Sequence, residues 1–307
     1  MVKVSIILPT YNRAELLRTC LESIVDQKYT DWELFVIDDC SQDDTEKVVQ
    51  TYLSDDRIHY IRNSENLGMS HSRKKGLKLC KTDMIFITED DLILHGDCLE
   101  ILVDTFIDLK KKIKTLFHVA PKSINVSRDR WEKSAVKLLG KFLSKTTPPD
   151  TQKSSRCELK LNMLTGYPYT EYGEIFTETP ILPSGGLYDL DLLRKIGFCE
   201  DYIGKPIFHE DNDLHFRARK CGLRFFHQPK AICYHLRYPY GGERSLNLLS
   251  QQYFTLRNHF HFIAKFFGLK SLYMAPIFAV THLLYPLEVL ITTTFSSLFM
   301  KDIESLI

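Results

Sequence analysis

The stretch Phe86-Ile87-Thr88-Glu89-Asp90-Asp91-Leu92-Ile93 decides which fold this chain of 307 residues is expected to adopt. Its apolar first half predicts a short buried strand, and the strand runs directly into three consecutive carboxylates. Adjacent carboxylates repel one another and are disfavoured when buried without a partner, so such a cluster meets solvent, a basic group or a cation. Oxygen ligands of this kind suit Mg²⁺ or Mn²⁺, which in turn suit a phosphorylated ligand. Taken alone, the stretch is as typical of an acidic loop tip as of a cation site.

Apolar strands and amphipathic helices alternate through residue 95. The predicted strands cover 2–8, 32–37, 57–62 and 84–88, and helical spacing of apolar residues recurs between them. This alternation predicts βαβ units and therefore an α/β fold, with a mostly parallel central sheet and helices on both faces.

Three of the predicted strands end in hydroxyl or carboxylate side chains. The strand ends are Thr10-Tyr11, Asp38-Asp39 and Glu89-Asp90-Asp91. In open α/β sheets, ligands bind beside the carboxyl ends of the strands, so we expect these groups to line one binding edge. The sequence contains neither G-x-G-x-x-G nor G-x-x-x-x-G-K-[ST], so this edge lacks a glycine-rich phosphate cradle. The pattern favours a nucleotide site that depends on a metal ion.

Composition narrows the class of protein and its compartment. The formal net charge is +1, so no global field points to nucleic acid. The eight cysteines form no C-x-x-C pair, which is typical of reduced thiols in a cytosolic protein rather than of a disulfide framework or a zinc site. The N-terminal residues do not have the pattern of a cleavable signal peptide. We therefore expect a cytoplasmic protein, including one that works at the cytoplasmic face of a membrane.

Four segments, in order and at matching spacing, carry a resemblance to a known family. They are Val4 to Arg13 (VSIILPTYNR), Phe35 to Thr45 (FVIDDCSQDDT), Asn66 to Arg73 (NLGMSHSR) and Phe86 to Asp91 (FITEDD). They resemble the opening strand, the VDDxSxDxT segment, the NxGxxxAR turn and the D-x-D metal motif of family 2 glycosyltransferases, which have the GT-A fold. The resemblance covers about residues 3–267 and is densest in 3–95 and 181–235.

The resemblance implies a donor site at the predicted sheet edge. By matching positions, the residues that would bind the nucleotide sugar are Pro9, Thr10, Tyr11, Arg13, Asp38, Asp39, Arg73 and Asp90. Asp39 would take the base, and Arg73 would approach the diphosphate. Asp91 would be the main ligand of Mg²⁺ or Mn²⁺, with Glu89 in the first D-x-D position. Two residues depart from the family pattern, because Glu89 replaces the usual Asp and Lys74 stands where the family commonly has Asn.

The second half of the chain carries further matching motifs. Phe208 to Gly222 resembles the family's xEDxDLxxRxxxxG motif, which implies Asp211 as the catalytic base with Glu210 beside it on the acceptor side. The Gly185-Gly186 pair matches a segment at the acceptor edge, and two glycines allow close backbone approach either to a ligand or to a packed strand. His235 follows the last predicted strand, and the resemblance implies that it helps to hold the metal or the diphosphate, with the metal as the expected partner. Three other histidines are expected to be structural: His209, His215 and His227.

Two regions leave alternatives open. Much of 121–160 is irregular and is typical either of an acceptor-side lid or of a tolerated insertion. Residues 272–300 are apolar and long enough to span a membrane, although the stretch is interrupted by Pro276, His282, Pro286 and Glu288. An interfacial helix pair, a helical hairpin packed on the catalytic domain and a spanning helix all remain compatible with this pattern.

The sequence therefore predicts a GT-A catalytic domain over 1–245, with a nucleotide-sugar-binding half (1–95) and an acceptor-side half (96–245). A hydrophobic helical region, compatible with membrane association, follows over 246–307. The resemblance implies an inverting hexosyltransferase that takes a sugar from a UDP-, GDP- or dTDP-linked donor. The acceptor would be a hydroxyl of a lipid-linked or cell-surface glycan, as in polysaccharide biosynthesis.

Two other functions remain compatible with the sequence. One is a sugar nucleotidyltransferase-like enzyme, although that class would want a basic glycine-rich loop after the first strand, which Pro9 to Arg13 does not provide. The other is a non-catalytic nucleotide-sugar or membrane-binding module, for which the departures at Glu89 and Lys74 leave room. The sequence is also compatible with a homo-oligomer.

Overall fold

The computed structural model describes residues 2–126, 158–161, 168–171, 173–179, 185–202, 209–236 and 248–279. Most of the irregular 121–160 region lies outside these residues, as does the part of the apolar C-terminal stretch beyond 279.

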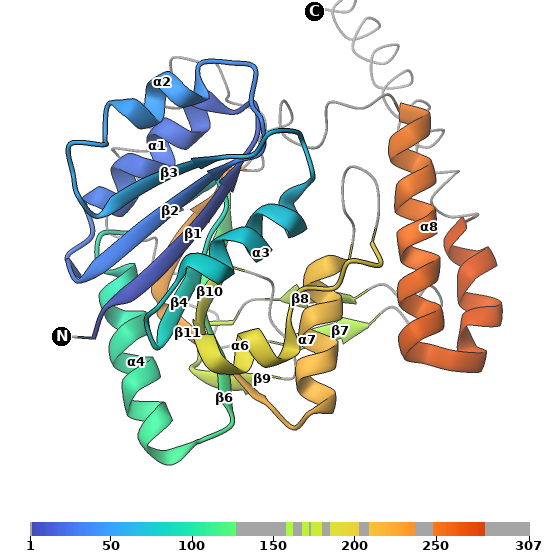
Figure 1. The fold of residues 1–307 in the computed structure, drawn as a ribbon. Coiled ribbons are helices and arrows are strands. Elements are labelled where there is room, and N and C mark those ends of the chain that lie inside the picture. The colour runs from blue at the N-terminus through green and yellow to red at the C-terminus, as the bar shows by residue number, and fades with distance from the viewer. Residues whose placement is uncertain are drawn as a thin grey trace, which may run out of the picture.

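A nine-stranded sheet forms the centre of the protein (Figure 1). The first four strands are β1 (Val4–Thr10), β2 (Trp32–Asp38), β3 (Ile58–Arg62) and β4 (Met84–Ile87). They lie in the order β3-β2-β1-β4 and all pair in parallel. The predicted βαβ units are therefore confirmed for this half of the sheet.

The second half of the sheet is mixed. It contains β10 (Gly186–Asp189), β6 (Leu116–Asn125), β11 (Arg224–His235), β5 (Leu92–Leu94) and β9 (Thr177–Thr179). Strand β10 runs antiparallel to both β4 and β6, and β5 and β9 run antiparallel to β11. Only the β6–β11 pair is parallel among the described pairings of this half. A separate two-stranded sheet joins β7 (Glu158–Leu161) and β8 (Pro168–Glu171).

Helices cover both faces of the central sheet. One core contains apolar side chains of α1 (Ala14–Val25), α2 (Thr45–Gln50) and α4 (Cys98–Lys112). The core on the other face contains side chains of α3 (Met69–Leu79), α6 (Leu190–Ile196) and α7 (Glu210–Lys220). Alternate residues of β1 enter the two cores: Val4, Ile6 and Leu8 pack on one face, and Ile7 packs on the other. A strand buried on both faces is apolar throughout, which is why the β1 sequence shows no polar alternation.

Strand pairing brings the polar strand ends together at one edge. Thr10 at the end of β1 lies opposite Asp38 at the end of β2, and the Asp39 amide donates to the Thr10 carbonyl at 2.9 Å. On the other side of the sheet, His235 at the end of β11 lies opposite Leu92, and the Leu236 amide donates to the Asp91 carbonyl at 2.9 Å. The edge predicted from three strands therefore includes the end of a fourth.

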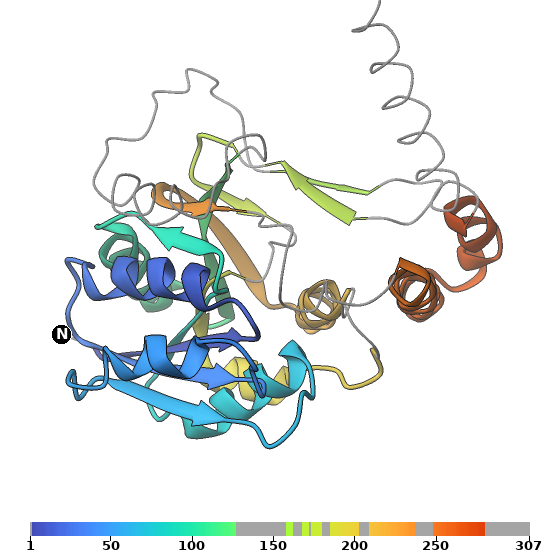
Figure 2. The same ribbon diagram turned by 90° about the horizontal axis from the view of Figure 1, so that it is seen from above.

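The C-terminal region begins with a helical hairpin. Helix α8 (Leu248–Phe267) ends at the 3₁₀ turn η3 (Gly268–Lys270), where Gly268 adopts a φ of +54°, and residues 271–279 are helical again. The rings of His259 and Phe278 stack with centroids 3.6 Å apart. In a continuous helix these residues would lie about 28 Å apart along the axis, so the chain must fold back at the turn. Figures 1 and 2 show the two segments side by side.

The hairpin is relevant to whether the apolar C-terminal region spans a membrane. By length and composition, Leu249–Ala279 is the one described segment that would suffice for a membrane span, with a mean hydropathy of 1.3. The turn at Gly268 divides it into two shorter helices. One side of the hairpin is buried in a core formed by Tyr202, Phe262, Ile263 and Met274. The described part of this region is therefore a helical hairpin, one side of which packs against Tyr202.

Substitution of Gly186 by Ala should destabilise the protein because β10 passes closely by β6. Gly186 has a φ of +148°, and a Cβ there would lie 2.8 Å from the Val119 carbonyl oxygen and would also collide with His118. Backbone strain and overpacking together should lower the free energy of unfolding by about 3 kcal/mol or more, measured by urea denaturation. Gly222→Ala is the matched control, because its φ is +74° but nothing lies within 4 Å of the added Cβ. A loss there as large as at Gly186 would contradict this account.

Candidate active site

Three side chains from two parts of the sheet edge form a compact cluster of potential metal ligands. Glu89 and Asp91 follow β4, and His235 ends β11; one ligand atom of each lies within 4.8 Å of the others. The Asp91 carboxylate is 3% exposed, and its Oδ2 lies 3.5 Å from His235 Nε2. Two carboxylates and an imidazole are a donor set that Mn²⁺ accepts readily and that also provides oxygen ligands for Mg²⁺. The residues present therefore fit a divalent ion.

Asp90 points away from this cluster and toward β1. Its Oδ2 accepts a hydrogen bond from Thr10 Oγ1 at 2.9 Å, and its Oδ1 accepts one from Arg13 NH1, also at 2.9 Å. Burial raises the pKa of the Asp90 carboxyl to about 6, although the charge of Arg13 acts in the opposite direction. The same guanidinium lies 3.4 Å from Asp91 Oδ2. Asp90 thus holds Arg13 beside the potential metal ligand Asp91 and joins the ends of β1 and β4.

Arg73 on α3 connects the potential metal ligand Glu89 to α7. Its side chain is 0% exposed, its NH2 lies 3.2 Å from Glu89 Oε1, and its NH1 donates to Glu210 Oε1 and to Asp211 Oδ1 at 2.6 Å each. Burial would lower the pKa of the guanidinium, but the charges of Asp211, Glu210 and Glu89 outweigh it and raise the pKa. The structure therefore places Arg73 in the interior, bound to three carboxylates.

The two acids at the start of α7 differ in exposure. Both Glu210 and Asp211 lie in the first helical turn, where the helix dipole favours negative charge. The side chain of Glu210 is 3% exposed, whereas that of Asp211 is 30% exposed. The Asp211 carboxylate is therefore accessible to solvent, while Glu210 is a buried partner of Arg73.

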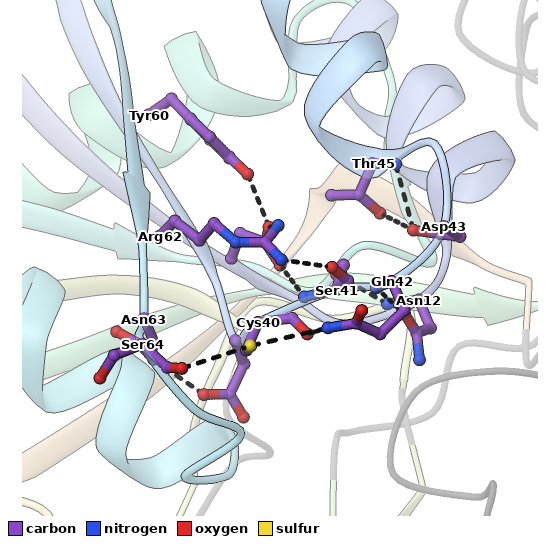
Figure 3. Close-up of polar contacts among 12 residues, drawn as sticks. Asn12, Cys40, Ser41, Gln42, Asp43, Thr45, Tyr60, Arg62, Asn63 and Ser64 are labelled. Carbon is purple, nitrogen blue, oxygen red and sulfur yellow. Dashed lines mark hydrogen bonds and ion pairs between the residues drawn. The ribbon is translucent and has the colours of Figure 1, made fainter.

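Asp38 and Asp39 organise the loops around the end of β2. The Asp38 carboxylate is 0% exposed and accepts hydrogen bonds from Tyr60 OH at 2.6 Å and Arg62 NH1 at 2.9 Å. The Asp39 carboxylate accepts hydrogen bonds from Asn63 Nδ2 at 2.8 Å and from the amides of Leu67 and Gly68 at 3.0 and 2.6 Å. Figure 3 shows Tyr60, Arg62 and Asn63 along β3 and directly after it, beside this loop. These contacts give both acids structural partners.

The sequence of β3 could have indicated that Tyr60 and Arg62 are partners of Asp38. Tyr60 and Arg62 are two residues apart on one strand, so their side chains leave the same face of the sheet. On the other side, Asn12 joins β1 to the loop after β2: its amide donates to Ser41 Oγ at 2.9 Å, and its Oδ1 accepts from the Gln42 amide at 2.7 Å (Figure 3). Among the neighbours of Asn12, Pro9 is buried and Tyr11 is half-buried.

The glycine pair after the undescribed 180–184 segment has a packing role. Gly186 is buried in β10 between β4 and β6, and a Cβ at Gly185 would lie 3.3 Å from the Leu92 side chain. Of the two interpretations of this pair, close packing of strands accounts for Gly186. Tyr188, two residues further, stacks on His118 with centroids 4.0 Å apart and contacts His215 Nε2 through its hydroxyl at 3.0 Å.

The three histidines expected to be structural are all buried. Burial lowers the pKa of His215 to about 4, so its ring is neutral near pH 7. His227 is also buried, with its Nε2 3.0 Å from the Gly173 carbonyl oxygen. His209 is buried as well, at the start of α7, in contact with α8.

Comparison with known proteins identifies relatives of this chain. Residues 5–154 match the sequence model described as Glycosyl transferase family 2. One relative is the GalNAc(5)-diNAcBac-PP-undecaprenol beta-1,3-glucosyltransferase of Campylobacter jejuni, 39% identical over 99 residues. Another is the poly(ribitol-phosphate) beta-N-acetylglucosaminyltransferase TarP of Staphylococcus aureus, 38% identical over 105 residues. The matches cover 31% and 33% of this chain and 32% of each relative, so the chain spans about a third of the length of these proteins.

The fold has solved counterparts. Residues 1–349 of S. aureus TarS in complex with UDP-GlcNAc match with a TM-score of 0.56 at 18% identity, over 92% of this chain and 73% of that one. The complex of the same protein with UDP matches with a TM-score of 0.55 at 19% identity, over 90% and 70%. The chain therefore has the GT-A fold of these solved structures. Its residues 5–154 belong to glycosyl transferase family 2.

Replacement of Arg73 by Met should destabilise the protein strongly. The change leaves the buried carboxylate of Glu210 and the partly exposed carboxylate of Asp211 close together without their shared cation. Breaking a buried ion pair in this way should lower the free energy of unfolding by about 3–5 kcal/mol, measured by urea denaturation. Lys74→Met on the same helix is the control: its partner Glu200 is 70% exposed, so the loss should be much smaller than that of Arg73→Met. Equal losses in the two variants would contradict the role assigned to Arg73.

Proposed function

We propose that this chain is an inverting hexosyltransferase that moves a sugar from a nucleoside-diphosphate sugar to an acceptor hydroxyl. The observation that carries the proposal is the position of Arg73, whose guanidinium contacts Glu89 of the metal cluster and Asp211 of α7. One buried residue thus holds the group expected at the donor and the group expected at the acceptor in a fixed relation. A protein that only binds a nucleotide sugar would not need Asp211.

The proposed step uses Asp211 as a general base. Its carboxylate takes the proton of the acceptor hydroxyl while the acceptor oxygen forms a bond to the anomeric carbon of the donor sugar. The bond between that carbon and the diphosphate oxygen breaks, and the electron pair leaves with the nucleoside diphosphate. Attack from the face opposite the leaving group inverts the anomeric configuration. The 30% exposure of Asp211 supports this assignment over Glu210.

Asp91, Glu89 and His235 are the proposed holders of Mg²⁺ or Mn²⁺. When bound, the ion supplies positive charge that stabilises the leaving diphosphate. Arg13, fixed by Asp90 next to Asp91, places a further positive charge at the same edge. On this proposal, Asp38 and Asp39 shape the base pocket through the loops that they organise, together with Pro9, Thr10 and Tyr11.

The comparisons favour particular substrates. TarS binds UDP and UDP-GlcNAc in the solved complexes, which supports a UDP-linked donor over the GDP- and dTDP-linked alternatives. The names of two relatives specify an undecaprenol-linked and a poly(ribitol-phosphate) acceptor, which supports a lipid-linked or cell-surface glycan. The exposed side chains of Leu249, Leu269 and Leu272 on the hairpin support peripheral association with the cytoplasmic face of a membrane. Residues 1–245 would then be the catalytic domain and 246–307 the associated helical region.

Asp211→Asn should abolish transfer and leave donor binding intact. The amide keeps the size of the side chain but cannot take the proton, so kcat should fall by about 10²–10⁴-fold. Release of UDP in the presence of acceptor measures transfer, and titration of the donor measures binding. Asp191→Asn on the exposed side of α6 is the control and should retain full activity. Near-wild-type transfer by the Asp211→Asn variant, with bound donor, would exclude the proposed base.

Asp91→Asn should remove the metal-dependent part of donor binding. A thermal-shift panel of UDP-, GDP- and dTDP-linked sugars, each with Mn²⁺ or with EDTA, measures this and also identifies the nucleotide. We expect stabilisation of the wild-type protein by UDP-sugars with Mn²⁺ and at least a tenfold weaker response of the variant, since charge at the main ligand is lost. A response to UDP-sugars that is equal with and without Mn²⁺ in both proteins would rule out the metal site.

A further inference from the structure

His209 has a strained backbone next to the proposed catalytic base. It immediately precedes Glu210 and Asp211, and its carbonyl accepts the Asp213 amide at 2.9 Å, so it caps α7. Its φ is +73°, in the left-handed region that non-glycine residues rarely adopt. Such a conformation is unfavourable for a non-glycine residue and persists only where the surroundings enforce it. The contacts that enforce this one therefore also set the direction in which α7 begins.

Helix α8 supplies two of the three contacts that hold the His209 ring. His209 Nε2 lies 2.7 Å from His259 Nδ1, and the ring stacks on Phe262 with centroids 4.4 Å apart and an interplanar angle of 7°. The third contact joins His209 Nδ1 to Asn212 Nδ2 at 3.0 Å. Because an amide nitrogen only donates, His209 Nδ1 accepts, and its Nε2–H donates to His259. Burial and the neighbouring His259 lower the pKa of His209 well below its usual value, so the His209 ring is neutral in this contact.

His259 is itself held rigidly within the hairpin. It is 0% exposed and stacks on Phe278 of the returning helix with centroids 3.6 Å apart. A second polar contact between the same helices joins Lys265 Nζ of α8 to Asp213 Oδ2 of α7 at 2.7 Å. Figure 2 shows α7 (gold), α8 (orange) and the returning segment in a row. The hairpin therefore contacts the start of α7 through both His209 and Asp213.

We propose that His259 is a positioning residue: through His209, the C-terminal hairpin sets the orientation of the first turn of α7 and hence of Asp211. Arg73 of α3 holds the same turn through Glu210 and Asp211, so two helices distant in sequence fix one carboxylate. The catalytic consequence rests on the proposed function. The structural coupling between α8 and the first turn of α7 does not.

The test compares His259→Ala with His259→Asn in the full chain. Loss of the ring should let His209 relax, so kcat should fall about ten- to a hundred-fold, as expected when a catalytic group is misplaced, with donor KM changed less than about twofold. Asn carries an acceptor oxygen near the position of Nδ1 and should restore at least half of the lost activity on a logarithmic scale. Hydrogen exchange of the Asn212 and Asp213 amides should be faster in the Ala variant than in the Asn variant.

His227→Ala is the matched control, because it removes another buried imidazole from a strand outside this contact. It should lower the unfolding midpoint without changing kcat or the exchange at Asp213. If His259→Ala does not fold, Phe262→Leu removes the ring stacked on His209 while keeping an apolar side chain, and the same readouts apply. Unchanged kcat and exchange in a folded His259 or Phe262 variant would overturn the proposal, as would an equal loss of kcat in His227→Ala.

The exchange measurement separates this proposal from the proposed function. A wild-type protein that transfers no sugar, but in which His259→Ala accelerates exchange at Asn212 and Asp213, would refute the transferase and retain the coupling. An active wild-type protein whose His259→Ala variant keeps both kcat and slow exchange would retain the transferase and refute the coupling.

Discussion

The site depends on the ion pairs that the buried guanidinium of Arg73 forms with three carboxylates. A charge removed from water is tolerated only when its partners satisfy it, and here those partners come from the loop after β4 and from the first turn of α7. Glu210 is the most buried of the three carboxylates and neutralises the cation, so Asp211 can remain partly open to solvent. Helix α3, the loop after β4 and the first turn of α7 cannot move independently without leaving a buried charge unpaired, which fixes the position of Glu89 relative to Asp211.

Seven acids at or near the sheet edge have different structural environments. Glu89 and Asp91 face His235, Asp90 holds Arg13 and Thr10, Asp38 and Asp39 secure loops, and Glu210 and Asp211 meet Arg73. Each carboxylate has at least one positively charged or hydrogen-bonding neighbour, so their repulsion is offset locally. The dense negative charge of the motif is thus compatible with burial because basic and amide groups from other strands are distributed among its members.

Local patterns predicted β1 to β4 and their helices, because apolar periodicity and turn residues act over a few neighbours. The antiparallel insertion of β10 between β4 and β6 could not be predicted this way, since it depends on long-range pairing. The motif identified Arg73 but not its burial, and it could not distinguish the exposure of Glu210 from that of Asp211. The contact between His209 and His259 had no sequence signal, because it joins residues fifty positions apart, one at the start of α7 and the other on α8.

The register between β11 and β5 has a consequence for biosynthesis. Glu89 and Asp91 emerge early from the ribosome, but His235 reaches them only when one of the last strands of the sheet has paired with β5 and β6. Strands β1 to β4 can form earlier from local βαβ units, and the growing chain then carries an acidic edge without its imidazole. The cluster of Glu89, Asp91 and His235 is therefore complete only after β11 has paired, and a nascent chain that ends before this strand lacks one of its three potential ligands.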